Sequence, residues 1–214
     1  MRAVQHQFVW VLCVFGLSAS WAAAASPDLS TPKKAATAFA LALQKGDFDT
    51  IRAVTTGQDA DYKLIQPIAA MTSAANRLHD ACVAKFGEDG KKIALSTGDP
   101  QDIPRQIEAS EEKITGDSAS IITRGTTEAN AVKLTKVGGD WKVDLAHYPQ
   151  KEQLAQVAQT AEPTAKLFSQ AASDVTSGKY HSATEASQDI QQRIMALQMA
   201  MLQSRQRPAT TPSR

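Results

Sequence analysis

Apolar residues change their spacing twice along this chain, and these changes constrain its fold more than any other feature. From residue 31 to residue 86 they recur every three or four positions, which is typical of helices with one buried face. Between residues 107 and 146 they alternate with polar residues, as in half-buried strands, and after Pro149 the helical spacing returns. The sequence therefore predicts an α+β fold in which N-terminal helices precede an antiparallel sheet and C-terminal helices follow it.

Three N-terminal helices are predicted, over residues 31–45, 47–54 and 61–86. Thr31 before Pro32 is an N-cap followed by proline at the first helical position, and Gly46 ends the first helix. Pro67 predicts that the first turn of the third helix is separate or kinked. Residues 87–104, rich in Gly, Asp, Lys and Pro, are expected to form a loop.

Two strand pairs account for the middle of the chain. Residues 107–115 and 119–126 flank the turn Gly116-Asp117, and residues 131–137 and 141–146 flank Gly138-Gly139-Asp140. Four consecutive strands joined by tight turns predict an antiparallel meander.

The C-terminal part reads as two helices. The first is interrupted by Pro163 and ends at Gly178, where Gly178-Lys179-Tyr180 repeats the glycine-charge-aromatic order of Gly46-Asp47-Phe48. Ser182 and Glu185 form a capping box that opens the last helix. Its apolar residues are spaced four, three and four, a seam that favours a partner helix: Ile190, Ile194, Leu197 and Met201. We expect a helical extension over residues 149–206 and a disordered tail over residues 207–214.

Residues 1–25 have the order of a signal peptide. Arg2 precedes an apolar run from Phe8 to Leu17, and small residues ending in Ala23-Ala24-Ala25 follow. The run is about half of the roughly 20 residues that cross a bilayer, so a retained anchor is the weaker interpretation. Lipidation at Cys13 is disfavoured because Leu12 is bulky for the position before a lipidated cysteine. The prediction is an exported protein, periplasmic or secreted, without a stable membrane span after cleavage.

The charge and cysteine content of the exported part argue against nucleic-acid binding and against an internal disulfide. Removal of residues 1–25 takes away Arg2 and leaves 22 Lys and Arg, one fewer than in the whole chain, against 22 Asp and Glu. A chain without net positive charge gives no support for nucleic-acid binding. Cys82 is then the single cysteine, so no internal disulfide can form.

Two short motifs carry a resemblance to a known family. Pro32, Ala35-Ala36, Phe39 and Gly46-Asp47-Phe48 resemble the opening of nuclear transport factor 2-like domains of bacterial exported proteins, and the segment from Gly138 to Asp144 is similar to their closing hairpin. The resemblance covers about residues 30–148. It implies a cone-like α+β domain over residues 26–148, with helices packed into a curved sheet and a pocket between them. Members include isomerases, dehydratases and domains without an assigned reaction.

Three residues are candidates for chemistry in such a pocket. Asp61 with Tyr62 could abstract a proton and stabilise an enolate, and His79 could act as a base if a carboxylate from another element reached it. The alternatives are a helix-start acid with a core aromatic, and a histidine at a helix edge. Phe39, Tyr62 and Trp141 are the expected pocket residues, with sheet packing as the alternative for Trp141.

Metal and cofactor sites find no support in the sequence. His79, His147 and His181 are isolated, and neither H-x-x-x-H nor C-x-x-C occurs. Gly138-Gly139 precedes a strand and not a helix, so it is a hairpin turn and not a phosphate loop. We expect no metal and no cofactor.

Three functions remain open on this basis. The leading hypothesis is a non-catalytic domain that binds a small apolar ligand, or a protein partner through the C-terminal helix. The alternative is a small-molecule isomerase or dehydratase that uses Asp61, Tyr62 and His79. The third is a purely structural role of the final helices.

The first testable prediction concerns the N-terminus of the exported protein. The end of the apolar run and the A-x-A site coincide, so mature protein should begin at Ser26, within two residues. Intact-mass measurement of the exported protein checks this, and retention of Met1 would contradict it.

Overall fold

The computed structural model describes residues 26–93, 102–149 and 151–206, without the side chains of residues 204–206. The predicted signal peptide and the predicted disordered tail lie outside these residues. The elements in chain order are α1 (Pro32–Lys45), α2 (Phe48–Val54), β1 (Thr55–Thr56), α3 (Asp59–Phe86), α4 (Glu88–Lys91), α5 (Asp102–Glu108), β2 (Glu111–Thr115), β3 (Ser118–Ile122), the 3-10 turn η1 (Glu128–Asn130), β4 (Val132–Val137), β5 (Asp140–Asp144), α6 (Lys151–Thr176) and α7 (Ala183–Gln206). The predicted α+β class is confirmed.

The sheet contains the predicted meander and one additional strand. Its order is β1-β5-β4-β3-β2, and the pairs β2–β3, β3–β4 and β4–β5 are antiparallel. β1 pairs with β5 in parallel, with Thr55 opposite Val143, so the sheet is mixed and not purely antiparallel as predicted. A strand of two residues after a helix has no periodicity by which a sequence could reveal it.

Two predicted boundaries between residues 87 and 115 are wrong. The expected loop contains the short helix α4 and the start of α5, and the first strand begins at Glu111 because Ile107 belongs to α5. Ile93, within the expected loop, is buried against α3, α6 and α7, and Leu95 lies outside the described residues. Helices of four and seven residues present too few apolar positions to show a helical period.

Both helical corners form as predicted. Gly46 has φ 68°, and the amides of Gly46 and Asp47 donate to carbonyls of the last turn of α1 at 3.1 and 2.9 Å. Gly178 has φ 80° and caps the end of α6 in the same way. At Gly46 any side chain is excluded as well, because a Cβ would lie 2.3 Å from the carbonyl oxygen of Ala69.

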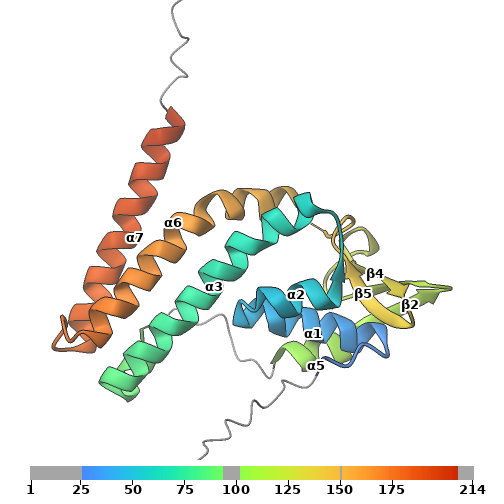
Figure 1. The fold of residues 1–214 in the computed structure, drawn as a ribbon, viewed down its shortest axis with the longest axis horizontal. Helices are drawn as coiled ribbons and strands as arrows, with labels where there is room; N and C mark the ends of the chain where they lie inside the picture. Colours follow the sequence, from blue (N-terminus) through green and yellow to red (C-terminus); the bar gives the residue numbers. More distant parts are fainter. Residues whose placement is uncertain (1–25, 94–101, 150, 207–214) are drawn as a thin grey trace, which may run out of the picture.

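Prolines do not divide the long helices. α3 is one helix of 28 residues through Pro67, and α6 is one helix of 26 residues through Pro163, where an interruption was predicted. Figure 1 shows α6 lying along α3 and arching over its N-terminal end. Packing along this shared length offsets the backbone hydrogen bond that each proline removes.

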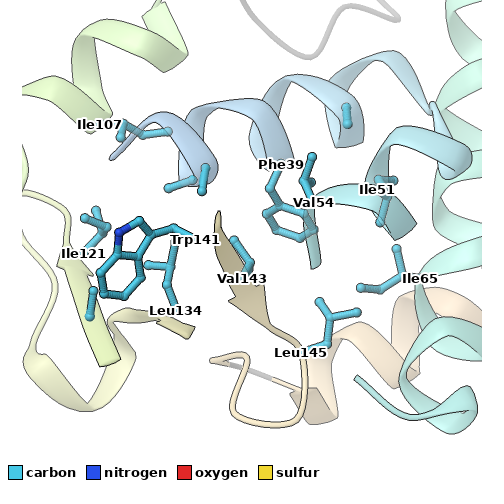
Figure 2. Close-up of a cluster of buried hydrophobic side chains, with 14 of the residues drawn as sticks. Phe39, Ile51, Val54, Ile65, Ile107, Ile121, Leu134, Trp141, Val143 and Leu145 are labelled. Carbon is cyan, nitrogen blue, oxygen red and sulfur yellow. The ribbon is translucent and has the colours of Figure 1, made fainter. Parts of the chain in front are cut away.

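A first core lies between α1, α2, the N-terminal half of α3 and one face of the sheet (Figure 2). The helix stripe predicted for residues 31–45 faces the alternating residues of β3, β4 and β5. The buried members with the largest side chains are Phe39, Ile51, Val54, Ile65, Ile107, Ile121, Leu134, Trp141, Val143 and Leu145.

A second core joins the C-terminal half of α3 to α6 and α7. Its buried residues are Leu78, Cys82, Ile93, Ala171, Val175, Tyr180, Ala186 and Ile190. The helix α3 therefore contributes to both cores, one with each half of its length. The division at residue 148 stays a prediction, but a fragment ending there would expose Leu78 and Cys82.

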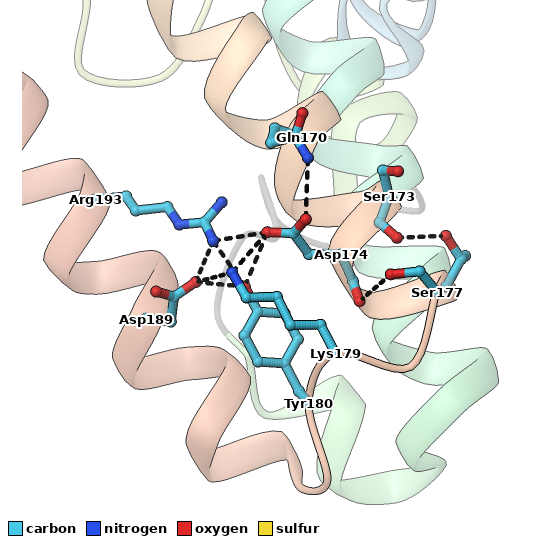
Figure 3. A network of polar contacts seen from close by, with 9 residues as sticks. Gln170, Ser173, Asp174, Ser177, Lys179, Tyr180, Asp189 and Arg193 are labelled. Carbon is cyan, nitrogen blue, oxygen red and sulfur yellow. Dashed lines mark hydrogen bonds and ion pairs between the residues drawn. The ribbon is translucent and has the colours of Figure 1, made fainter.

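An ion-pair network fixes the corner between α6 and α7 (Figure 3). Arg193 on α7 donates to Asp174 on α6 and forms an ion pair with Asp189 one turn earlier on its own helix, both at 2.6 Å. Tyr180 in the corner donates its hydroxyl hydrogen to Asp189. Burial alone would raise the pKa of Asp174, but the hydrogen bonds from Gln170 and Arg193 lower it to about 2. The network therefore stays ionised at any neutral or mildly acidic pH.

The capping box of α7 forms with one change. The amide of Glu185 donates to the Ser182 hydroxyl at 3.2 Å, as predicted. The Glu185 carboxylate, however, accepts from the amide of His181 at 2.9 Å, one residue before the expected partner.

The shared core generates a prediction for stability. Leu78→Ala removes a fully buried side chain where α3 meets α6 and α7, and should lower the free energy of unfolding by about 2–5 kcal/mol. Urea denaturation measures the change, and Ile114→Ala, at a side chain 54% exposed on β2, should change it by less than about 0.5 kcal/mol. A loss below about 1 kcal/mol for Leu78→Ala would mean that the C-terminal helices do not pack on α3.

Candidate functional site

The predicted catalytic residues do not meet in one place. Asp61 and Tyr62 lie in the first turn of α3, and His79 lies 18 residues beyond Asp61 on the same helix. A rise of about 1.5 Å per residue separates their backbones by about 27 Å. No single concave site can contain all three side chains.

Asp61 is buried and bound to structural partners. Its Oδ2 accepts from the amide of Gln58 at 2.9 Å, which makes it the third residue of a capping box at the start of α3. Its Oδ1 accepts from the ammonium group of Lys151, the first residue of α6. The Lys151 hydrogen bond, and then the Gln58 amide, hold the pKa of Asp61 below its usual value. This carboxylate ties α3 to α6 and offers no free oxygen as a base.

Tyr62 serves the corner between α2 and α3. Its ring lies edge-on to Phe48, with centroids 6.5 Å apart, and the guanidinium of Arg52 lies 4.8 Å from its centroid. Its hydroxyl lies 3.3 Å from Thr55 Oγ1 and donates to the Thr55 carbonyl at 3.4 Å. The phenol therefore stabilises the entry to β1.

His79 is a half-buried residue at the edge of α3. Its Nδ1 is buried and has no hydrogen-bond partner, and no described carboxylate forms an ion pair with its ring. A histidine that acts as a base needs a partner that holds one ring nitrogen while the other faces substrate. The described surroundings of His79 do not supply one.

The expected pocket residues also lie apart. Trp141 is 5% exposed within the first core, with Lys136 Nζ 5.7 Å from its ring centroid, and packs against the sheet as in the alternative interpretation. Phe39 borders a cavity, where it contacts Tyr148 edge-on at 5.6 Å between centroids. Tyr62 belongs to the α2–α3 corner.

The cavity beside Phe39 has a volume of about 290 Å³ and opens between α1, α3, the start of α5 and the first turns of α6. Most of its lining is aliphatic or aromatic. The lining residues are Phe39, Leu43, Gln44, Ile65, Ile68, Thr72, Ile103, Tyr148 and Leu154. Ile65, Ile68 and Thr72 follow the three-and-four spacing expected of the third helix. Tyr148 and Leu154 come from segments that the sequence did not connect with a pocket.

Polar groups in this cavity are few. The Thr72 hydroxyl donates to the carbonyl of Ile68 at 3.1 Å within its own helix. Burial raises the pKa of Tyr148, so its phenol stays protonated near neutral pH. The cavity therefore suits an apolar ligand and lacks an ionised group for chemistry.

A larger groove follows the outer side of α1, with a volume of about 750 Å³. Several charged side chains that line it already bind other groups of the protein. Lys34 pairs with Asp28 at 2.7 Å, and Lys33 donates to the carbonyl of Glu108 at 2.6 Å. Asp47 accepts from the amide of Thr50 as the N-cap of α2. Size alone favours this groove, but its polar groups already serve the fold, and we regard the smaller apolar cavity as the better ligand site.

Within the described ranges, no three His, Cys, Asp or Glu side chains gather where they could hold a metal ion. A histidine-carboxylate contact joins His147 Nδ1 to Asp144 at 2.8 Å at the surface. Likewise, none of the described helices combines the length and apolarity that crossing a membrane requires.

Comparison with models of protein families, with curated proteins and with solved structures gave no match.

The Asp61–Lys151 pair generates a prediction with a defined pH dependence. Lys151→Met leaves a buried carboxylate without its cation and should destabilise the fold by about 1–2 kcal/mol at pH 7, a low value because Lys151 is 40% exposed. Because folding lowers the pKa of Asp61, this contribution is present above the ordinary carboxyl pKa and is lost as the pH falls through the lowered value. The stability difference between wild type and variant should therefore shrink below about pH 4.

Urea denaturation across this pH range measures the effect. Lys166→Met is the matched control, because it removes an exposed pair with Glu162 and should cost less than about 0.5 kcal/mol. Equal effects of the two substitutions, or a difference independent of pH, would show that Asp61 is not held by Lys151.

Proposed function

We propose that this protein is a non-catalytic binding domain of an exported protein, and that it holds a small apolar ligand in the cavity beside Phe39 and Tyr148. The observation that carries the proposal is the lining of that cavity, which combines aliphatic side chains from α1, α3, α5 and α6 with one protonated phenol. Ligand sites are typically apolar hollows with a few polar groups that orient the ligand.

The arrangement of titratable groups supports binding over catalysis. The isomerase or dehydratase alternative needs an acid and a base that face one substrate. Asp61 is bound by Gln58 and Lys151, and His79 lies about 27 Å away along α3. The acid-base pair of that alternative has no support in this geometry.

We further propose that residues 26–148 form a cone-like domain of the nuclear transport factor 2-like kind, whose curved sheet packs on helices. Support comes from the position of α1 across the sheet, from the corner at Gly46, and from the hairpin between β4 and β5. Export to the periplasm or the medium is supported by the residue order in positions 1–25.

Filling the cavity tests the binding proposal. Thr72→Trp places an indole on the α3 wall of the cavity and should weaken the binding of the neutral apolar dye N-phenyl-1-naphthylamine by at least about tenfold. Fluorescence titration of the dye measures the affinity.

Thr176→Trp is the matched control. Thr176 is an exposed helical threonine whose hydroxyl also donates to the carbonyl four residues earlier, and it does not line this cavity. Dye affinity should be unchanged in this variant. The proposal is wrong if the wild type binds no dye, or if both substitutions weaken binding equally.

A further inference from the structure

The distal half of α7 carries exposed apolar side chains on one face. Met195, Met199 and Leu202 are 56%, 57% and 52% exposed, and their spacing of four and three places them in one line, which we call the apolar stripe. The other exposed large apolar residues described, Ile114, Val137 and Val157, lie singly on β2, β4 and α6. A line of three on one helix is typical of an interaction surface.

The rest of the molecule does not cover the stripe. Ile190 and Ile194, the first half of the seam predicted from the sequence, pack inward on the second core. Arg193 anchors the helix at this level through Asp174 and Asp189. Beyond this level α7 diverges from α6 (Figure 1), so the face that remains open is the stripe beside the predicted seam.

An unsupported helix end of this kind needs a partner. Isolated helices shorter than about 12–15 residues are marginal in water, because propagation must offset a costly nucleus. The 12 residues from Met195 to Gln206 are of that length. None of those whose side chains the structure describes belongs to either core.

The charge pattern indicates which partner fits. Residues 194–204 contain no Lys, Arg, Asp or Glu, so two copies of this stretch face each other without repulsion. Helices that lie on lipid surfaces carry Lys or Arg along their polar face, and this stretch has none. Gln188 and Gln192 continue the same spacing towards the N-terminus with uncharged polar side chains. A second copy of this face can therefore pack on it without burying an unpaired charge.

We propose that two copies of the chain associate through α7, with the helices antiparallel and the apolar stripe of each copy facing that of the other. A spacing of four and three is that of a coiled-coil seam, and a two-fold axis near Met199 places the same three residues of both copies in the interface. The body of each copy joins α7 at its N-terminal end, so an antiparallel pair keeps the two bodies at opposite ends.

The association is weak and depends on concentration. The stripe spans eight residues, about 10 Å along the helix axis, and buries much less surface than the roughly 1,200–2,000 Å² of a stable interface. Association should be measurable between about 10 and 500 µM, and not at nanomolar concentration.

Sedimentation equilibrium of the full chain and two variants tests the proposal. Met199→Glu puts a charge at the centre of the stripe while keeping a good helix former, and should raise the dissociation constant at least about tenfold. Ile114→Glu makes the same kind of change at an exposed apolar residue on β2 and should leave the dissociation constant unchanged. Circular dichroism and the unfolding midpoint verify that both variants fold.

Three outcomes would overturn the proposal. The wild type could remain monomeric up to about 500 µM, or Met199→Glu could associate as strongly as the wild type and Ile114→Glu. The third outcome is co-sedimentation of the wild type, but not of Met199→Glu, with vesicles of phosphatidylethanolamine and phosphatidylglycerol, which would assign the stripe to a lipid surface instead.

Discussion

One helix, α3, holds the two halves of this protein together. Its first half contributes Ile65 and Ala69 to the core beneath the sheet, and its second half contributes Leu78 and Cys82 to the core shared with α6 and α7. A continuous helix of 28 residues is about 42 Å long and stiff on that scale. The positions of the sheet and of the C-terminal helices therefore both depend on this helix, and a change in its packing is felt in both cores.

Carboxylates from α3, α6 and α7 hold this arrangement together through ion pairs. Asp61 with Lys151 joins the starts of α3 and α6, and Asp174 with Arg193 joins α6 to α7. Each carboxylate has a lowered pKa because its cation and its hydrogen-bond donors favour the ionised form. A carboxylate bound in this way cannot also accept a proton from a substrate near neutral pH. Neither carboxylate lines the cavity beside Phe39, whose walls are mainly aliphatic and aromatic and suit an apolar ligand.

The two proposals concern different parts of the molecule and can fail independently. The ligand cavity lies at the N-terminal end of α6, where Leu154 forms part of its wall, and the apolar stripe lies on α7. A substitution such as Thr72→Trp fills the cavity without touching α7. Loss of ligand binding with unchanged association, or the reverse, would therefore separate a binding domain from an interaction module.

The sequence by itself determined the α+β class, four of the five strands, the two glycine corners and the buried stripe of α1, because periodicity, turn glycines and caps are local properties. It did not determine β1, α4 or α5, which are too short to show a period. Tertiary structure decided the site. Asp61 and Lys151 are 90 residues apart in the sequence, and Phe39 and Tyr148 are separated by a similar number of residues. No local sequence pattern can therefore predict either contact. Tertiary packing also decided which face of α7 stays open, because Ile190 and Ile194 turn inward only where α3 and α6 are present to cover them.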